Sequence, residues 1–189
     1  MFTTLSVIKA DVGSIGGHVT PSERLIDTIS RHVAGGLEDG LLSDYYLGAT
    51  GDDIAILMAH ERGAGNEEVH RLAWDAFQAG TRTAREQGLY GAGQDLLAYS
   101  FSGNVKGLGP AVAEIEFEAR PNEPFLMFMA DKTEPGAYNL PLYLAFADPM
   151  NTAGLLLSPE LTKGFRFRVM DVSYTEGDRI IDLTAPEDL

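Results

Sequence analysis

The stretch LLSDYYLGATGDDIAILMAH, residues 41–60, decides how the first part of the chain folds. Two largely apolar runs flank the short sequence TGDD, a pattern that predicts two strands joined by a tight turn. Asp52 and Asp53 then lie at or just past the tip of this hairpin. Two adjacent carboxylates at the start of a buried strand repel each other and lose hydration, so we expect a positive partner beside them.

Further strands are predicted on both sides of the hairpin. Residues 2–10, FTTLSVIKA, are rich in β-branched and apolar types and end at Asp11, where the glycine-rich loop VGSIGGH begins. Residues 111–119 alternate cleanly and predict a half-exposed strand, whereas the continuous apolar run 124–131 predicts a buried one. The sequences FRFRVMDVSYT and DRIIDLTA predict a closing pair of strands.

Two amphipathic helices are predicted between these strands. The first begins at a proline in PSERLIDTISRHVAG, residues 21–35, and we expect Gly35 and Gly36 to stop it. The second, residues 66–88, starts with an asparagine and two acids and ends in an arginine followed by glycine. The chain is therefore α/β in the broad sense (α+β). Because no linker or repeat divides it, we expect a single domain over residues 1–189.

Composition narrows the classes of partner. Fourteen Lys and Arg against 28 Asp and Glu give a net charge of −14, which argues against nucleic acid or an anionic membrane surface. This negative charge favours a cation as the partner. The absence of cysteine excludes disulfides, thiolate metal sites and cysteine nucleophiles. With no basic leader and no apolar run of about 20 residues, we expect a soluble, cytoplasmic protein.

Acidic residues stand at the ends of several predicted strands, and a histidine and a glutamine stand in glycine-rich loops. Carboxylate, imidazole and amide ligands without thiolates suit Mg²⁺ or Mn²⁺. If the elements converge, these side chains hold one hard cation; the alternative is that each aspartate only caps its strand or turn. The candidate ligands are Asp11, His18, Asp52, Asp53, Gln94 and Asp131.

Other residues allow two interpretations each. His18 is either a ligand or a solvated loop histidine, and Tyr90 either takes part in chemistry or packs with its hydroxyl at the surface. Lys106 and Lys132, both in glycine-containing loops, either present a charge to phosphate or are solvated. Nucleotide-binding loops are excluded, because GSIGGH has no GK[ST] and GAGQDL lacks the last glycine of a dinucleotide motif.

Five blocks of the sequence resemble one known family. They are VIKADVGSIGGH, TGDD, GLYGAGQDLLAYSFSGNVKGLGP, MADKTEPGAYNLPLY and FADPMNTAGL. Together they resemble the N-terminal half of the archaeal-type bifunctional fructose-1,6-bisphosphate aldolase/phosphatase, or class V fructose-1,6-bisphosphatase. The resemblance runs from about Val7 to about Leu156. It implies a layered sandwich, with a mixed or antiparallel sheet and helices packed on one face, in a homo-oligomer.

The resemblance also implies roles for single residues. Asp11 would bind Mg²⁺ and activate the water for the phosphatase reaction, while the vicinal pair Asp52 and Asp53 would bind separate Mg²⁺ ions. The remaining implied Mg²⁺ ligands are His18, Gln94 and Asp131, and the implied substrate contacts are His18, Tyr90, Gly103, Asn104 and Lys132.

The implied function is a Mg²⁺-dependent fructose-1,6-bisphosphate 1-phosphatase of gluconeogenesis. Aldolase chemistry in the family needs a Schiff-base lysine and a tyrosine in the C-terminal half. We expect it to be absent here, because Lys163 is the last lysine and its LTKGF context does not match. The alternatives are a non-catalytic module that binds metal and sugar phosphate, or one half of a split aldolase/phosphatase.

Overall fold

A computed structural model describes residues 2–96, 109–118, 165–171 and 179–185, with the single residues 129, 144, 148 and 150. Contacts divide the chain into two compact units, Met1–Asp131 and Lys132–Leu189. The single-domain interpretation stays a prediction.

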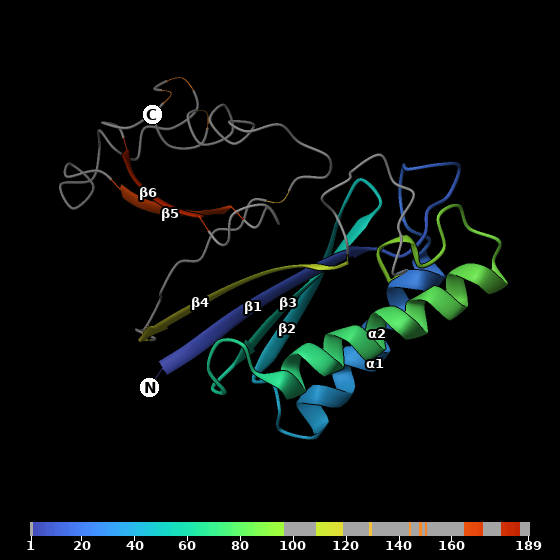
Figure 1. Cartoon of the computed structure of the whole chain (residues 1–189), viewed down its shortest axis with the longest axis horizontal. Coiled ribbons are helices and arrows are strands. Elements are labelled where there is room, and N and C mark those ends of the chain that lie inside the picture. Colours follow the sequence, from blue (N-terminus) through green and yellow to red (C-terminus); the bar gives the residue numbers. More distant parts are fainter. Residues whose placement is uncertain are drawn as a thin grey trace. The chain divides into compact units, whose positions relative to one another are not determined.

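The first unit is built on a four-stranded antiparallel sheet with the strand order β2-β3-β1-β4 (Figure 1). The strands are β1 (Phe2–Asp11), β2 (Asp44–Thr50), β3 (Asp53–His60) and β4 (Ala111–Glu118). β1 therefore lies in the interior of the sheet, between β3 and β4. The hairpin predicted from residues 41–60 is confirmed as β2 and β3, and Asp52 lies in the turn between them.

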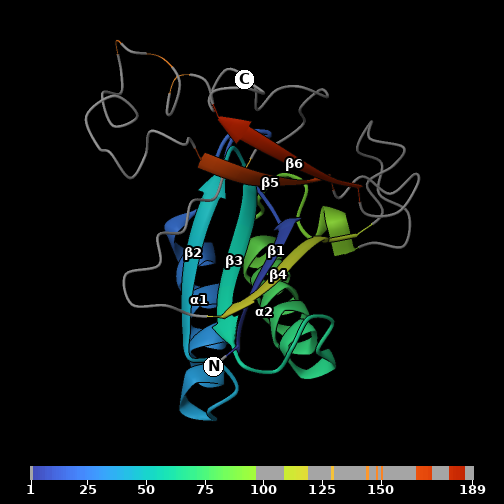
Figure 2. The same cartoon turned by 90° about the vertical axis from the view of Figure 1, so that its left-hand side faces the viewer.

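Two helices, α1 (Glu23–Glu38) and α2 (Glu67–Glu86), pack together on one face of this sheet, as both views show (Figures 1 and 2). Ser22 caps α1 and Asn66 caps α2 through side-chain oxygens that accept backbone N–H groups. Alternate residues of β1, among them Ile8 and Ala10, meet Ile29 and Phe77 of the helices in one apolar core. The predicted fold class, a layered α+β arrangement with helices on one face, is confirmed.

The predicted end of the first helix was wrong. Helix α1 runs through Gly35 and Gly36 to Glu38, and Gly40 takes the left-handed conformation just beyond it. Gly36 is buried, and a Cβ atom there would lie 2.5 Å from Leu72 of α2. The glycine therefore allows close helix packing instead of ending the helix, which local sequence signals do not reveal.

A buried polar network joins the sheet to α2 on the helix-covered face. His60 Nε2 lies 2.8 Å from the Ser6 hydroxyl, which donates to Glu114 Oε1 at 2.6 Å. His70 of α2 reaches the same Glu114 oxygen at 2.8 Å. His60 Nδ1 accepts the backbone N–H of Arg62, so in the neutral ring the proton lies on Nε2 and points at Ser6. Both histidines thus have partners within the fold.

The second unit contributes one antiparallel hairpin to the described residues. It consists of β5 (Phe165–Asp171) and β6 (Arg179–Ala185), which confirms the predicted closing pair of strands. The predicted buried strand at 124–131 lies outside the described residues apart from Met129. Among the helices that the structure describes, none has the length and apolar character to cross a membrane.

Candidate metal centre

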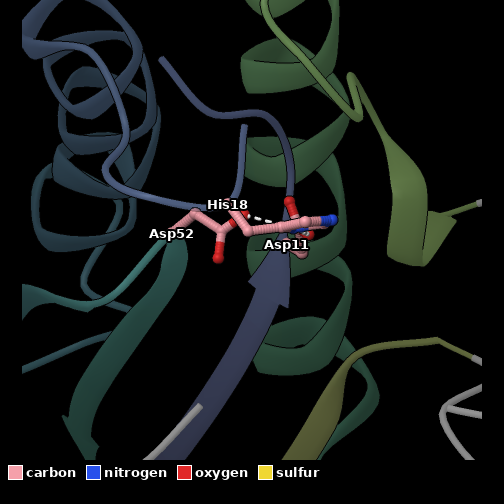
Figure 3. Close-up of side chains that lie close together, drawn as sticks. All are labelled: Asp11, His18 and Asp52. Carbon is pink, nitrogen blue, oxygen red and sulfur yellow. Dashed lines mark hydrogen bonds and ion pairs between the residues drawn. The ribbon is translucent and has the colours of Figure 1, made fainter. Parts of the chain in front are cut away.

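Three side chains from separate segments meet at the end of the sheet where β1 finishes. Asp11 is the last residue of β1, His18 belongs to the loop that follows, and Asp52 lies in the β2–β3 turn (Figure 3). The antiparallel register pairs Asp11 with Asp53, so the acidic turn is fixed beside the strand end. The structure brings these three residues together, and their role as ligands of a cation stays a prediction.

The His18 loop owes its shape to Ser14 and two glycines. The Ser14 hydroxyl accepts the N–H of Val19 at 2.9 Å and donates to the carbonyl of Gly17 at 3.1 Å. Gly16 and Gly17 both have positive φ, which costs little without a Cβ atom. This local closure turns His18 back over the end of β1.

The ligand-type atoms lie close to one another. His18 Nδ1 is 2.7 Å from Asp52 Oδ2 and 3.4 Å from Asp11 Oδ2, and one such atom from each residue fits within 4.8 Å of the others. Asp11 and Asp52 are buried, with relative exposures of 3% and 0%, whereas His18 is exposed. The cluster thus opens to solvent on the histidine side.

The surroundings of the Asp11 carboxylate disfavour its charged form. Burial, followed by the negative charges of Asp52, Asp95 and Asp53, raises the pKa of Asp11 from 3.8 to about 7, against the opposing effect of His18. Among the described residues, neither Asp11 oxygen has a hydrogen-bond partner, although both are buried. A buried carboxylate in this state is stabilised by a proton or by a cation.

The second aspartate of the pair, Asp53, has a partner that sequence reasoning missed. Its carboxylate contacts the ammonium group of Lys9 on β1. The positive partners of the vicinal pair are thus His18 for Asp52 and Lys9 for Asp53. A lysine two residues before an acid, and so on the same face of the strand FTTLSVIKAD, was the available signal.

The glycine-rich loop 89–96 is bound along the chain that follows β1. Ser14 and Tyr90 exchange two backbone hydrogen bonds of 2.9 Å, and Gly93 donates its N–H to the carbonyl of Val12 at 3.0 Å. The ring of Tyr90 meets His18 edge to face, with 4.9 Å between centroids. This arrangement places an exposed aromatic side chain beside the cluster.

The end of the same loop forms the short 3₁₀ helix η1 (Gln94–Leu96). Asp95 Oδ2 accepts the backbone N–H of Asp11 at 2.8 Å, so Gln94 directly precedes a residue that is bonded to the end of β1. Asp95 was not singled out from the sequence. Its position directly after Gln94, with an amide partner 84 residues away, gave no local signal.

The donor set of the cluster fits a divalent cation. Two buried carboxylates and one imidazole supply oxygen and nitrogen ligands, the set that Mg²⁺ and Mn²⁺ accept. The two buried Asp11 oxygens without hydrogen bonds give an independent indication that a positive group belongs there. The roles expected for Gly103, Asn104, Asp131 and Lys132 fall on residues outside the described ranges.

Comparison with known proteins identifies the wider group. The family described as fructose-1,6-bisphosphatase matches residues 2–189. Three curated relatives, each named fructose-1,6-bisphosphate aldolase/phosphatase, are 60% identical (Thermus thermophilus, over 100% of this chain and 52% of the relative), 54% identical (Cenarchaeum symbiosum, 96% and 47%) and 50% identical (Metallosphaera sedula, 100% and 49%). The chain spans about half the length of the curated relatives it matches, as the resemblance to an N-terminal half predicted.

Proposed function

The chain belongs to the fructose-1,6-bisphosphatase family, and on that premise we propose that it hydrolyses a phosphate monoester of fructose 1,6-bisphosphate with Mg²⁺ at the cluster of Asp11, His18 and Asp52. The observation that carries the proposal is the buried Asp11 carboxylate, which has no hydrogen-bond partner among the described residues and lies beside a second buried carboxylate and a histidine. A protein keeps such a costly arrangement where it serves binding or catalysis.

A bound Mg²⁺ would neutralise phosphoryl oxygens and acidify water at the site. Asp52 and His18 would hold it, because their ligand atoms already lie in contact at 2.7 Å. For His18 to serve as a ligand through Nδ1, the contact between that nitrogen and Asp52 Oδ2 must give way to bonds from both groups to the cation.

Hydrolysis of a phosphate ester also needs a group that takes a proton from the attacking water. Asp11 suits this role, because its buried carboxylate has no hydrogen-bond partner among the described residues and lies beside the other two residues of the cluster. With a cation bound at the cluster, the pKa of Asp11 would be lower and its carboxylate would stay ionised. Tyr90, exposed and packed against His18, lies where a substrate that reaches the cluster would meet an aromatic side chain.

The relatives' names also include an aldolase activity. We assign aldolase chemistry to no residue of this chain, because Lys163, its last lysine, lies in a context that does not match the family's Schiff-base motif. The cytoplasmic location, the place in gluconeogenesis and the homo-oligomer remain part of this proposal.

The test is release of inorganic phosphate from fructose 1,6-bisphosphate by the purified 189-residue chain, in EDTA and as Mg²⁺ is added. Asp52→Asn keeps the shape of the side chain and removes its charge; Asp75→Asn, the same change at an exposed position of α2, is the matched control. We expect Mg²⁺-dependent release by the wild type and the control and none by Asp52→Asn.

Absence of release from the folded wild type, with Mg²⁺ bound, would favour a binding module. Release that begins only when a second chain is added would favour a split enzyme. Equal rates in Asp52→Asn and the control would refute the assignment of the cluster.

A further inference from the structure

Lys9 lies on the same sheet face as the acidic cluster. Along β1 its side chain and that of Asp11 point to the same side, because residues two apart share a face of a strand. The register pairs Asp11 with Asp53 and Lys9 with Ala55, so Lys9 reaches Asp53 diagonally. This face is opposite to the one on which Ile8 and Ala10 meet the helices.

The neighbours of Lys9 leave its side chain room to lie along the sheet. Its cross-strand partners on both sides are alanines, Ala55 on β3 and Ala111 on β4. Its side chain is 28% exposed and that of Asp53 is 8% exposed, so the ion pair is largely shielded from water. A shielded pair is screened less than a surface pair and fixes its charge in place.

Both charges of this pair, the negative one on Asp53 and the positive one on Lys9, affect the proposed cation site. Asp53 directly follows Asp52 and is paired with Asp11 in the strand register, so its carboxylate belongs to the same group of acids. The Lys9 ammonium offsets Asp53 directly and so lessens the repulsion among the carboxylates when no cation is bound. The same positive charge repels an incoming divalent cation.

We propose that Lys9 is the resident counter-ion of this site: it stabilises the cation-free fold and, by competing electrostatically, lowers the affinity of the cluster for divalent cations. The inference rests on the proposed cation site, but it concerns the affinity of that site and does not depend on phosphate release.

The test measures Mn²⁺ binding by equilibrium dialysis, and thermal unfolding in EDTA and in saturating Mn²⁺. Lys9→Met keeps most of the side-chain stem and removes the charge, and Lys9→Arg keeps the charge. Arg24→Met removes one positive charge from the exposed pair with Glu86 on the helical layer and controls for net charge.

We expect Lys9→Met to bind Mn²⁺ about tenfold more tightly than the wild type, as an order of magnitude for removing one nearby unit charge from a partly shielded site. Its Tm should fall by several degrees in EDTA, with most of the loss recovered in Mn²⁺. Lys9→Arg should match the wild type in both measurements, and Arg24→Met should leave Mn²⁺ affinity unchanged.

Unchanged or weaker Mn²⁺ binding by a folded Lys9→Met variant would overturn the inference, as would an equal loss of Tm with and without Mn²⁺. If Lys9→Met is unfolded in EDTA, folding on addition of Mn²⁺ is the expected result, and failure to fold in saturating Mn²⁺ is the contrary one. If the wild type binds no Mn²⁺, or if Asp52→Asn binds Mn²⁺ as tightly as the wild type does, the cation site itself is refuted.

Discussion

Replacing Asp11 with asparagine should stabilise the cation-free fold at alkaline pH while it removes cation binding. In the wild type, burial and three neighbouring carboxylates raise the pKa of Asp11 from 3.8 to about 7. Below pH 3.8 the residue is protonated in both the folded and the unfolded state and contributes no pH dependence. Between pH 3.8 and about 7 the unfolded chain releases a proton that the folded protein keeps, so stability falls as pH rises.

The size of the effect follows from the shift. A change of about three pKa units corresponds to about 4 kcal/mol, at about 1.4 kcal/mol per unit. Because Asp11 is only 3% exposed, little of this is lost to solvent screening. An asparagine removes the charge but leaves a buried amide to satisfy, at a cost of about 1 to 2 kcal/mol. Asp11→Asn should therefore be more stable than the wild type by about 2 to 3 kcal/mol at pH 8.

The assay is urea unfolding of both proteins in EDTA at pH 5 and pH 8. The difference between them should grow with pH and level off above pH 7. Saturating Mg²⁺ should reverse the order at pH 8, because it stabilises only the wild type. A variant that is less stable than the wild type at pH 8 in EDTA, or a difference that does not change with pH, would refute the account of Asp11.

Two further substitutions test hydrogen bonds that hold the site and the sheet in place. Asp95→Ala should remove the acceptor for the Asp11 N–H, lower the free energy of unfolding by about 1 to 2 kcal/mol and speed amide exchange in the loop 89–96. Asp95→Asn should nearly preserve the stability and the exchange rates of the wild type. Equal exchange rates in the two variants would contradict this prediction. Although burial opposes it, hydrogen bonds from Ser6, His70 and the backbone of Gly65 hold the pKa of Glu114 below 4.5. Glu114→Gln should therefore destabilise the protein by about 2 kcal/mol at pH 7, and by less as pH falls below 4.5, in urea unfolding; a constant difference would argue against it.

Much of the fold was predictable because its signals are local. The β-branched and apolar composition of β1, the short acidic turn of the β2–β3 hairpin and the amphipathic pattern of α2 are all signals that lie within short stretches of the chain. The extension of α1 past Gly36 was not predictable, since it depends on the close approach of Leu72 from another helix.

The candidate site was predictable in its residue types but not in its pairings. The positions of Asp11, His18 and Asp52 at strand ends and in a glycine-rich loop indicated a cation site before any geometry was known. Lys9 and Asp95 were missed, because their partners stand 44 and 84 residues away and depend on strand register and loop closure. Such contacts carry no pattern that a local window can detect.

Anomalous diffraction from crystals of the chain grown with Mn²⁺ would test the cation site most directly. The account predicts an anomalous peak bonded to the carboxylates of Asp11 and Asp52 and to the ring of His18. A fully occupied Mn²⁺ peak elsewhere, with His18 Nδ1 still hydrogen-bonded to Asp52 and the Asp11 oxygens without a cation, would contradict it.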